Sequence, residues 1–179
     1  SAPASPAAPP PAAPSGPLIT LHVYDVTDFG VGYDISRQVI AFNRGLFSSF
    51  EVGIFHAGVA VCYSGFETVE YSFGWCDAGT GVYTCAPRRA PGASFRCAID
   101  CGRTPLTRRQ VAAAIARMAR EWDGASYALL HRNCCSFCDA LCDRLRVRRP
   151  PAWVNGLADA FAPVGAPSDY VTGKLDALQ

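Results

Sequence analysis

The sequence lacks both a large charge imbalance and a long apolar run. Its 179 residues carry 16 lysine and arginine side chains against 15 aspartate and glutamate side chains. Charges this evenly balanced create no whole-molecule field that would favour a nucleic acid or a membrane surface as the partner. No apolar stretch approaches the roughly 20 residues needed to span a bilayer. We therefore expect a soluble protein without a transmembrane segment and without a nucleic-acid partner.

The first 17 residues lack charged side chains and large apolar side chains altogether. They consist mainly of proline and alanine, and proline removes amide donors and favours extended backbone. A secretory signal would need a basic start and a run of large apolar residues. We therefore predict a disordered Pro/Ala-rich tail at 1–17, one domain of ordinary size at 18–162 and a flexible C-terminal tail at 163–179.

Histidine is scarce, whereas cysteine is abundant. The chain has three histidines and nine cysteines, and nine is an odd number in a segment without a secretory signal. This favours reduced thiols and a cytoplasmic or nuclear compartment. The best candidate for a disulfide is Cys97 with Cys101, yet both are expected on the same face of one strand. We therefore expect free thiols.

Four segments alternate apolar and polar side chains with the period of two that is typical of β-strands. They are 18–26, 55–63, 67–74 and 93–101. The alternation predicts that the first segment exposes Thr20, His22 and Tyr24. It predicts that the last segment buries Phe95, Cys97, Ile99 and Cys101. Because the turns between segments carry glycine, serine or proline, neighbouring strands are expected to pair antiparallel.

The period then changes to that of a helix. Segment 107–122 spaces its apolar residues at helical intervals, and Thr107 with Gln110 forms a capping box. Segment 133–145 follows, with Asn133 as its cap, and a short closing helix is expected at 152–161. Strands followed by helices predict an α+β domain in which a mostly antiparallel sheet packs against helices.

The second helical segment contains the sequence "NCCSFCDALC", whose four cysteines allow several interpretations. Cys135 and Cys138 have the spacing of zinc ligands, and Cys97 with Cys101 would have to complete the site. In a helix, however, Cys135 lies about 100° around the axis from its neighbour, so the sulfurs would not converge. Cys138 and Cys142 are better explained as small apolar side chains of the core. We expect no metal and no cofactor.

Cys134 differs from the other cysteines because it would lie in the first turn of the helix. Unpaired amides and the positive end of the helix dipole favour a thiolate there. A base is needed, and His56 is the best candidate because a strand start would hold its imidazole rigidly. His22 is interpreted as a surface residue, and His131 lies outside the helix start. From the residues alone, a structural role for His56 stays open.

Six blocks carry a resemblance to a known family. "VYDVTD", "GIFHAGVAV", "EYSFG", "PGASFR", "RNCCSFCDALCDRL" and "PPAWVNGLA" resemble, in the same order, the PPPDE or DeSI thiol peptidases, most closely the DeSI-2 and plant DeSI-like branch. The resemblance covers about residues 18–162. It implies a permuted papain fold with a cysteine and histidine dyad. In that dyad His56 matches the G-I-x-H-x-G block and Cys134 matches the N-C-x-x-F block.

The resemblance implies a hydrolase that removes ubiquitin or SUMO from conjugated proteins, and relatives suggest a homodimer. One alternative is a protein S-acyl thioesterase that uses the same dyad. A second is a phospholipid acyltransferase of a related permuted group, but the second histidine typical of that group is absent from 63–75. A third is a non-catalytic module that binds ubiquitin-like proteins.

The sequence departs from the family pattern at two places. Cys135 stands where many members have asparagine, and the run at 29–52 is longer than expected. Neither Gln38 nor Gln110 lies where an oxyanion role can be assigned, and no third member of a catalytic triad is identified.

Overall fold

A computed structural model describes residues 15–26, 55–63, 67–129 and 131–155 of the chain. The 29–52 run, Gln38, the C-terminal tail and most of the N-terminal tail lie outside these residues. The described strands are β1 (Leu18–Val26), β2 (Phe55–Cys62), β3 (Thr68–Phe73), β4 (Val82–Cys85) and β5 (Ala93–Arg103). The described helices are α2 (Arg108–Glu121) and α3 (Cys134–Leu145), with single 3-10 turns at Gly124–Ser126 and Ala152–Asn155.

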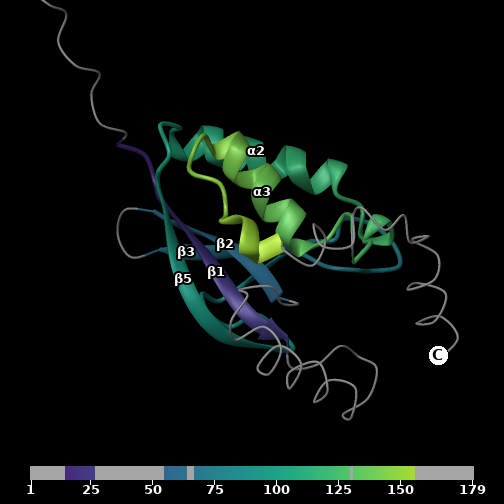
Figure 1. The fold of residues 1–179 in the computed structure, drawn as a ribbon. Coiled ribbons are helices and arrows are strands. Elements are labelled where there is room, and N and C mark those ends of the chain that lie inside the picture. The colour runs from purple at the N-terminus through teal and green to yellow at the C-terminus, as the bar shows by residue number, and fades with distance from the viewer. Residues whose placement is uncertain (1–14, 27–54, 64–66, 130, 156–179) are drawn as a thin grey trace, which may run out of the picture.

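The five strands form one sheet in the order β4-β3-β2-β1-β5 (Figure 1). Each of the four pairings is antiparallel, which confirms the predicted mostly antiparallel sheet and the α+β class. The sequence pattern did not reveal β4, because four residues are too few to show a period of two. β5 returns to the far edge of the sheet beside β1, although β1 comes first in the chain.

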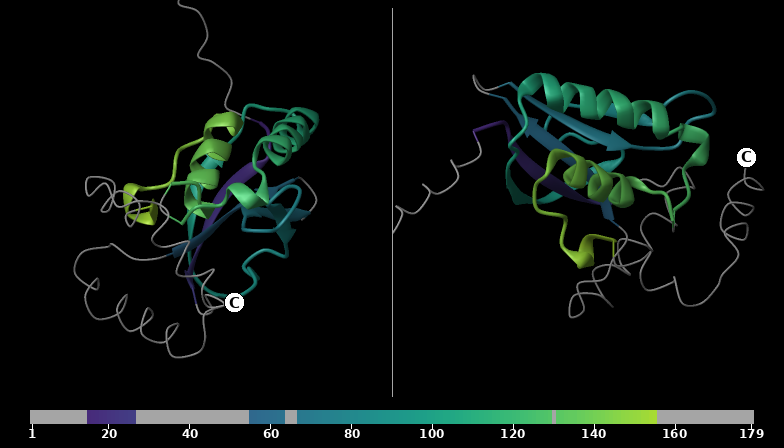
Figure 2. Two further views of the ribbon diagram at one scale, coloured as in Figure 1. Left: turned by 90° about the vertical axis from the view of Figure 1, so that its right-hand side faces the viewer. Right: turned by 90° about the horizontal axis from the view of Figure 1, so that it is seen from above.

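Both helices lie over the same face of the sheet (Figures 1 and 2). The apolar side chains of β1 and β2 meet those of α3 in one core, where a fully buried aliphatic side chain typically contributes about 1.5–3 kcal/mol. The buried residues of α3 are Cys134, Cys135, Phe137, Cys138, Leu141, Cys142 and Leu145. The predicted apolar stripe of α3 is therefore confirmed, and Cys135 lies in the core besides.

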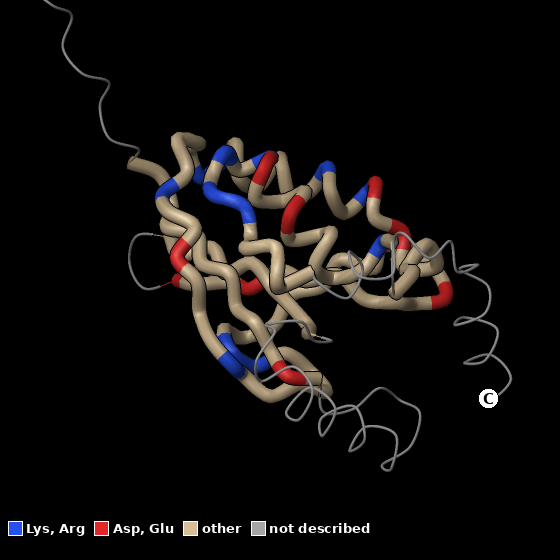
Figure 3. The backbone as a smooth tube through the Cα atoms, in the orientation of Figure 1, with Lys and Arg blue, Asp and Glu red and all other residues tan. Residues whose placement is uncertain are grey.

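The start of each helix follows the sequence prediction. Thr107 and Gln110 form the capping box of α2, and Asn133 caps α3 by accepting from the Ser136 amide. Figure 3 shows basic and acidic positions side by side on the two helices. One such pair, Arg144 of α3 with Glu121 of α2, joins them. Of the closing helix expected at 152–161, the described residues contain only the 3-10 turn at Ala152–Asn155.

The prediction that β1 exposes one face is wrong for two of its three residues. His22 is 4% exposed and Tyr24 is fully buried, because the second face of the sheet is also covered. The ring of Phe95 packs edge-on against both of them. The backbone amide of Arg88 donates to the Glu70 carboxylate beside them. Polar residues of an alternating strand are thus buried by residues that come 64 to 73 positions later.

The prediction that Phe95 belongs to the main core is also wrong, since 36% of it is exposed. Val23 pairs with Cys97, but Tyr24 pairs with Phe95, so Arg96 is an extra residue in β5. A bulge of one residue reverses which face the following side chains occupy. Phe95 therefore lies on the face of Tyr24, whereas Cys101, beyond the bulge, is buried as predicted.

Candidate active site

The candidate site lies at the start of β2, in the stretch that pairs with β1 but lies before the described pairing with β3. β2 pairs with β1 from Phe55 onward, whereas the described pairing with β3 starts at Val59. Carbonyl groups on this stretch are therefore left for side chains to bond. The Cys134 and Cys135 sulfur atoms lie 3.8 and 3.7 Å from the Phe55 carbonyl oxygen.

Cys134 lies at the first position of α3, as predicted, and only 3% of it is exposed. The Asn133 side chain accepts from the Ser136 amide at 2.8 Å, and the Ser136 hydroxyl lies 2.8 Å from the Asn133 amide that donates to it. This reciprocal cap fixes where the helix starts and so where the thiol lies. The positive end of the helix dipole then favours an anionic sulfur.

Cys134 and His56 shift each other's pKa in opposite directions. The neighbouring Cys135 thiol, by hydrogen bonding, lowers the pKa of Cys134 well below 9.0; burial opposes this, and His56 adds to it. Burial lowers the pKa of His56, but the charge and hydrogen bond of Cys134 outweigh burial and place it above 6.5. Opposite shifts of this kind favour a thiolate beside an imidazolium.

Cys135 acts on the site as a hydrogen-bond donor. Because it donates to the Cys134 sulfur and is itself buried, the pKa of Cys135 lies well above 9.0. It therefore stays protonated at the pH at which its neighbour ionises. The two adjacent thiols are thus distinguished by their surroundings, and only Cys134 has a base beside it.

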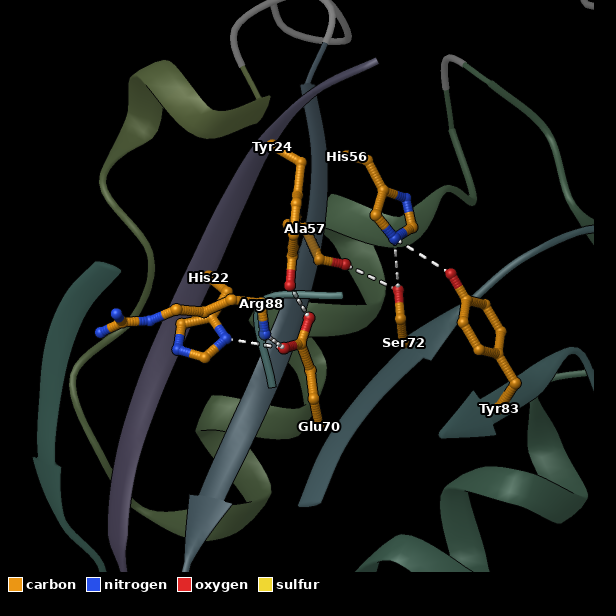
Figure 4. Close-up of polar contacts among 8 residues, drawn as sticks. All are labelled: His22, Tyr24, His56, Ala57, Glu70, Ser72, Tyr83 and Arg88. Carbon is orange, nitrogen blue, oxygen red and sulfur yellow. Dashed lines mark hydrogen bonds and ion pairs between the residues drawn. The ribbon is translucent and has the colours of Figure 1, made fainter. Parts of the chain in front are cut away.

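Two hydroxyl groups lie beside one ring nitrogen of His56 (Figure 4). Its Nε2 atom lies 3.1 Å from the Ser72 hydroxyl oxygen on β3 and 3.0 Å from the Tyr83 hydroxyl oxygen on β4. Ser72 is fully buried, and the Tyr83 ring lies nearly parallel to the imidazole, at an angle of 13°. Sequence patterns missed both residues, because nothing in a strand marks one serine or tyrosine as facing a histidine.

A second polar cluster lies next to the first on the same face (Figure 4). The fully buried Glu70 carboxylate accepts from His22 Nδ1 at 2.6 Å, from the Tyr24 hydroxyl at 2.5 Å and from the Arg88 amide at 2.9 Å. Burial raises the pKa of Glu70, but these donors outweigh burial and lower it below 4.5. His22 is therefore a buried partner of a carboxylate, which corrects its interpretation as a surface residue.

Gly58 explains how a carboxylate fits between the strands here. A Cβ atom on Gly58 would lie 2.5 Å from the Glu70 Oε1 atom, closer than any real contact. The glycine in the "FHAGVAV" block is thus required by the neighbouring carboxylate.

The remaining residues considered from sequence do not join the site. His131 is exposed, and Gln110 is an exposed part of the α2 cap. Within the described part of the chain, no three histidine, cysteine, aspartate or glutamate side chains gather as metal ligands would. All nine cysteines, Cys97 and Cys101 included, are free thiols.

A small hollow lies on the far side of Cys135, between α3 and the segment that follows it. Its volume is about 240 Å³, below the roughly 300 Å³ at which small-molecule pockets begin. It is lined by Cys135, Asp139, Arg149, Pro150, Pro151, Ala152, Val154 and Asn155.

Among the described residues there is also no helix long and apolar enough to cross a bilayer.

Comparison with known proteins identifies relatives of the chain. A DeSI-like protein of Arabidopsis thaliana is 33% identical over 61% of this chain and 47% of its own length. A DeSI-like protein of Schizosaccharomyces pombe is 32% identical over 78% of this chain and 63% of its own length. A Caenorhabditis elegans protein named desumoylating isopeptidase 1 homolog is 31% identical over 63% of this chain and 34% of its own length. The chain thus spans less than two thirds of each.

The match to a family model is more extensive. The model described as "PPPDE putative peptidase domain" matches residues 18–167, which include every described strand and helix and both polar clusters. Because most of the chain is matched in this way, the chain belongs to the PPPDE peptidase family, with its papain-like α+β fold.

Proposed function

We propose that the chain is a cysteine isopeptidase that hydrolyses ubiquitin-type or SUMO-type conjugates, with Cys134 as nucleophile and His56 as general acid and base. The observation that carries the proposal is the pairing of these two residues, in which the pKa of the thiol is lowered and that of the imidazole is raised. A thiolate with an acid beside it is what acyl transfer from an amide requires.

The proposed reaction has two stages. The Cys134 thiolate attacks the isopeptide carbonyl, and protonated His56 gives its proton to the departing lysine amine as the C–N bond breaks. An acyl-enzyme thioester remains. His56 then takes a proton from water, the resulting hydroxide attacks the thioester carbonyl, and the modifier leaves with a free carboxylate while the thiolate is restored.

The start of α3 is the proposed place for the oxyanion of each tetrahedral intermediate. The Ser136 amide is already bonded by Asn133 and the Phe137 amide by the Asn133 carbonyl. The amides of residues 134 and 135 belong to the same turn, where helix geometry provides no partner within the helix. We assign the oxyanion to them, since donors at a helix start stabilise developing negative charge.

Two further observations support the proposal. One relative is named as a desumoylating isopeptidase homolog, which favours SUMO conjugates as the substrate class. The histidine precedes the cysteine in the chain, at 56 and 134, which is the order expected of a permuted papain fold. Both the permutation and the choice of modifier are parts of the proposal.

The test uses ubiquitin and SUMO probes that carry an electrophile at the C-terminus, followed by mass spectrometry of the labelled peptide. We expect an adduct on Cys134, no adduct in Cys134→Ala, and an unchanged adduct in Cys62→Ala, which removes a half-buried thiol of β2 outside the site. Labelling at Cys135 would contradict the assignment of the nucleophile. Turnover of a fluorogenic thioester without labelling by either probe would favour S-acyl thioesterase activity. Binding without labelling or turnover would favour a non-catalytic module.

A further inference from the structure

We propose that Ser72 and Tyr83 are positioning residues that keep the proton of the His56 imidazole on Nε2 and so direct Nδ1 to the Cys134 sulfur. The inference rests on the dyad proposed above and adds the residues that orient its base. It concerns two hydroxyl groups, on β3 and β4, that both lie within hydrogen-bond distance of Nε2.

The first step is to locate the proton of Ser72. Its hydroxyl donates to the Ala57 carbonyl oxygen at 2.7 Å, and a hydroxyl has one proton to give. Towards His56 Nε2, 3.1 Å away, the Ser72 oxygen can therefore only accept. The nitrogen facing it must carry hydrogen. The fully buried position of Ser72 between two strands prevents the hydroxyl from turning to solvent.

The second step concerns Tyr83. Its hydroxyl oxygen lies 3.0 Å from the same Nε2 atom, so the two oxygens share one N–H as a three-centre contact. Burial raises the pKa of Tyr83 to about 12, so it remains a neutral phenol at neutral pH. Because Nε2 carries the hydrogen, the Tyr83 oxygen accepts it, and the phenol proton is directed away from Nε2.

The third step follows from the two-sided geometry of the imidazole. Figure 4 shows Nε2 facing both hydroxyls and the other ring nitrogen facing away from them. With Nε2 protonated, Nδ1 is the basic atom of the neutral ring, and it is left for the hydrogen bond with Cys134. When both nitrogens are protonated, the same two oxygens stabilise the imidazolium.

Other titratable residues also face His56, so Ser72 and Tyr83 are not the sole influence on its protonation. Cys134 comes from α3, Tyr83 from β4 and Tyr24 from β1, with its ring centre 5.8 Å from the imidazole. Glu70 of β3 adds a more distant negative charge that also favours the imidazolium. Of these, Tyr83 contacts the ring through a hydroxyl on Nε2, as Ser72 does.

A structural role for Ser72 makes a different prediction. Its bond to the Ala57 carbonyl joins β3 to the part of β2 that lies before their described ladder. If this were its whole purpose, Ser72→Ala would lower stability but leave the chemistry of the remaining dyad unchanged. The pH dependence of the thiol therefore separates the two roles.

The experiment measures the rate at which iodoacetamide alkylates Cys134 as a function of pH, read by mass spectrometry of its peptide. Ser72→Ala and Tyr83→Phe are compared with Thr84→Ala, an exposed hydroxyl of β4, and with Tyr71→Phe, a neighbouring tyrosine of β3. Alkylation needs no protein substrate, so it reports on the dyad whether or not the proposed isopeptidase activity is found.

We expect Ser72→Ala to move the rise of the alkylation rate to higher pH by about one unit and to lower kcat roughly tenfold at unchanged KM. Tyr83→Phe should shift the profile in the same direction by less, Ser72→Thr should restore it, and both controls should match the wild type. An unchanged profile in Ser72→Ala and Tyr83→Phe would overturn the proposal, even with lowered stability. If Ser72→Ala does not fold, the half-buried Tyr83→Phe decides.

A direct reading of the proton completes the test. In a Cys134→Ala background at a pH above the pKa of His56, long-range nitrogen–proton NMR correlations distinguish the two neutral tautomers. We expect the Nε2–H form, with an admixture of the Nδ1–H form once Ser72→Ala is added. A predominant Nδ1–H form with Ser72 in place would overturn the proposal.

Discussion

Two histidines on the same face of the sheet have similar partners and opposite roles. His22 and Tyr24 surround the Glu70 carboxylate, whereas Ser72 and Tyr83 surround the His56 imidazole. Glu70 and Ser72 are two residues apart on β3, so the clusters are adjacent (Figure 4). Each combines a histidine with a tyrosine, but one is centred on an anion and the other on an imidazole.

The central group decides what each cluster does. The Glu70 carboxylate accepts three donors within the cluster, so its charge is satisfied there, and the cluster holds strands and loop together. Around His56, by contrast, the partners on Nε2 are neutral hydroxyls, and the charge that balances an imidazolium is the Cys134 thiolate. We infer that the first cluster stabilises the fold and that the second is arranged for reaction.

The largest expected effect comes from removing the imidazole of the second cluster. His56→Ala should lower the rate of isopeptide hydrolysis by about a thousandfold, since a general acid and base typically contributes 10²–10⁴-fold. The thermal midpoint should change little, because His56 is only half-buried at a strand end. His131→Ala, which removes an exposed histidine, is the matched control in a steady-state assay. Equal losses in both variants would refute the assignment of the base.

The opposite result is expected for the first cluster. Glu70→Ala removes the acceptor of two buried side chains and should destabilise the fold by about 3 kcal/mol or more. Urea unfolding measures the loss, and Glu67→Ala, which removes an exposed glutamate paired with Arg108, should cost under about 1 kcal/mol. Folded Glu70→Ala protein should keep most of its Cys134 alkylation rate. A large loss of the Cys134 alkylation rate in folded Glu70→Ala protein would show that the two clusters act as one unit.

The pH dependence of stability separates the clusters further. The pKa of Glu70 is lower in the folded state than its ordinary value of 4.5, because its donors outweigh burial. The stability that it contributes is therefore complete above about pH 4.5 and is lost as the pH falls through the folded pKa. Urea midpoints between pH 3 and 6 should fall more steeply on the acid side for the wild type than for Glu70→Gln. Parallel curves would contradict an ionised Glu70.

The two clusters also show how far sequence reasoning reached. Residues whose position follows from local periodicity and capping were predicted, among them Cys134 after its cap and the buried stripe of α3. His56 and Cys134 were paired from sequence through the family resemblance, and the structure brings them together. Whether they catalyse stays a prediction.

What sequence could not give depends on contacts between distant segments. His22 alternates with apolar neighbours as a surface residue would, and its burial requires Glu70, 48 residues later. Phe95 was misplaced because a bulge at Arg96 cannot be read from a pattern with a period of two. Ser72 and Tyr83 have ordinary strand neighbours, and their meaning comes only from the register of β3 with β4, in which they pair.

The smallest expected effect concerns Cys135, which belongs to neither polar cluster yet adjusts one of them. Its thiol donates to the Cys134 sulfur, and that bond is the largest cause of the lowered pKa of Cys134. Cys135→Ala should therefore raise the pKa of Cys134 and slow its alkylation at pH 7 about fivefold, the effect of one hydrogen bond of roughly 1 kcal/mol. Cys62→Ala, which removes a thiol outside the site, should leave the rate unchanged.

The nature of the donor can be tested at the same position. Cys135→Ser replaces the thiol by a stronger donor of similar shape, so it should keep the alkylation rate near that of the wild type. The family resemblance led us to expect asparagine here, and its amide would also donate, so Cys135→Asn should behave as Cys135→Ser does. If serine and asparagine were as slow as alanine, the sulfur would act through its size or packing against the adjoining hollow. The reactive cluster would then depend on the shape of the first turn of α3, as the Glu70 cluster depends on Gly58.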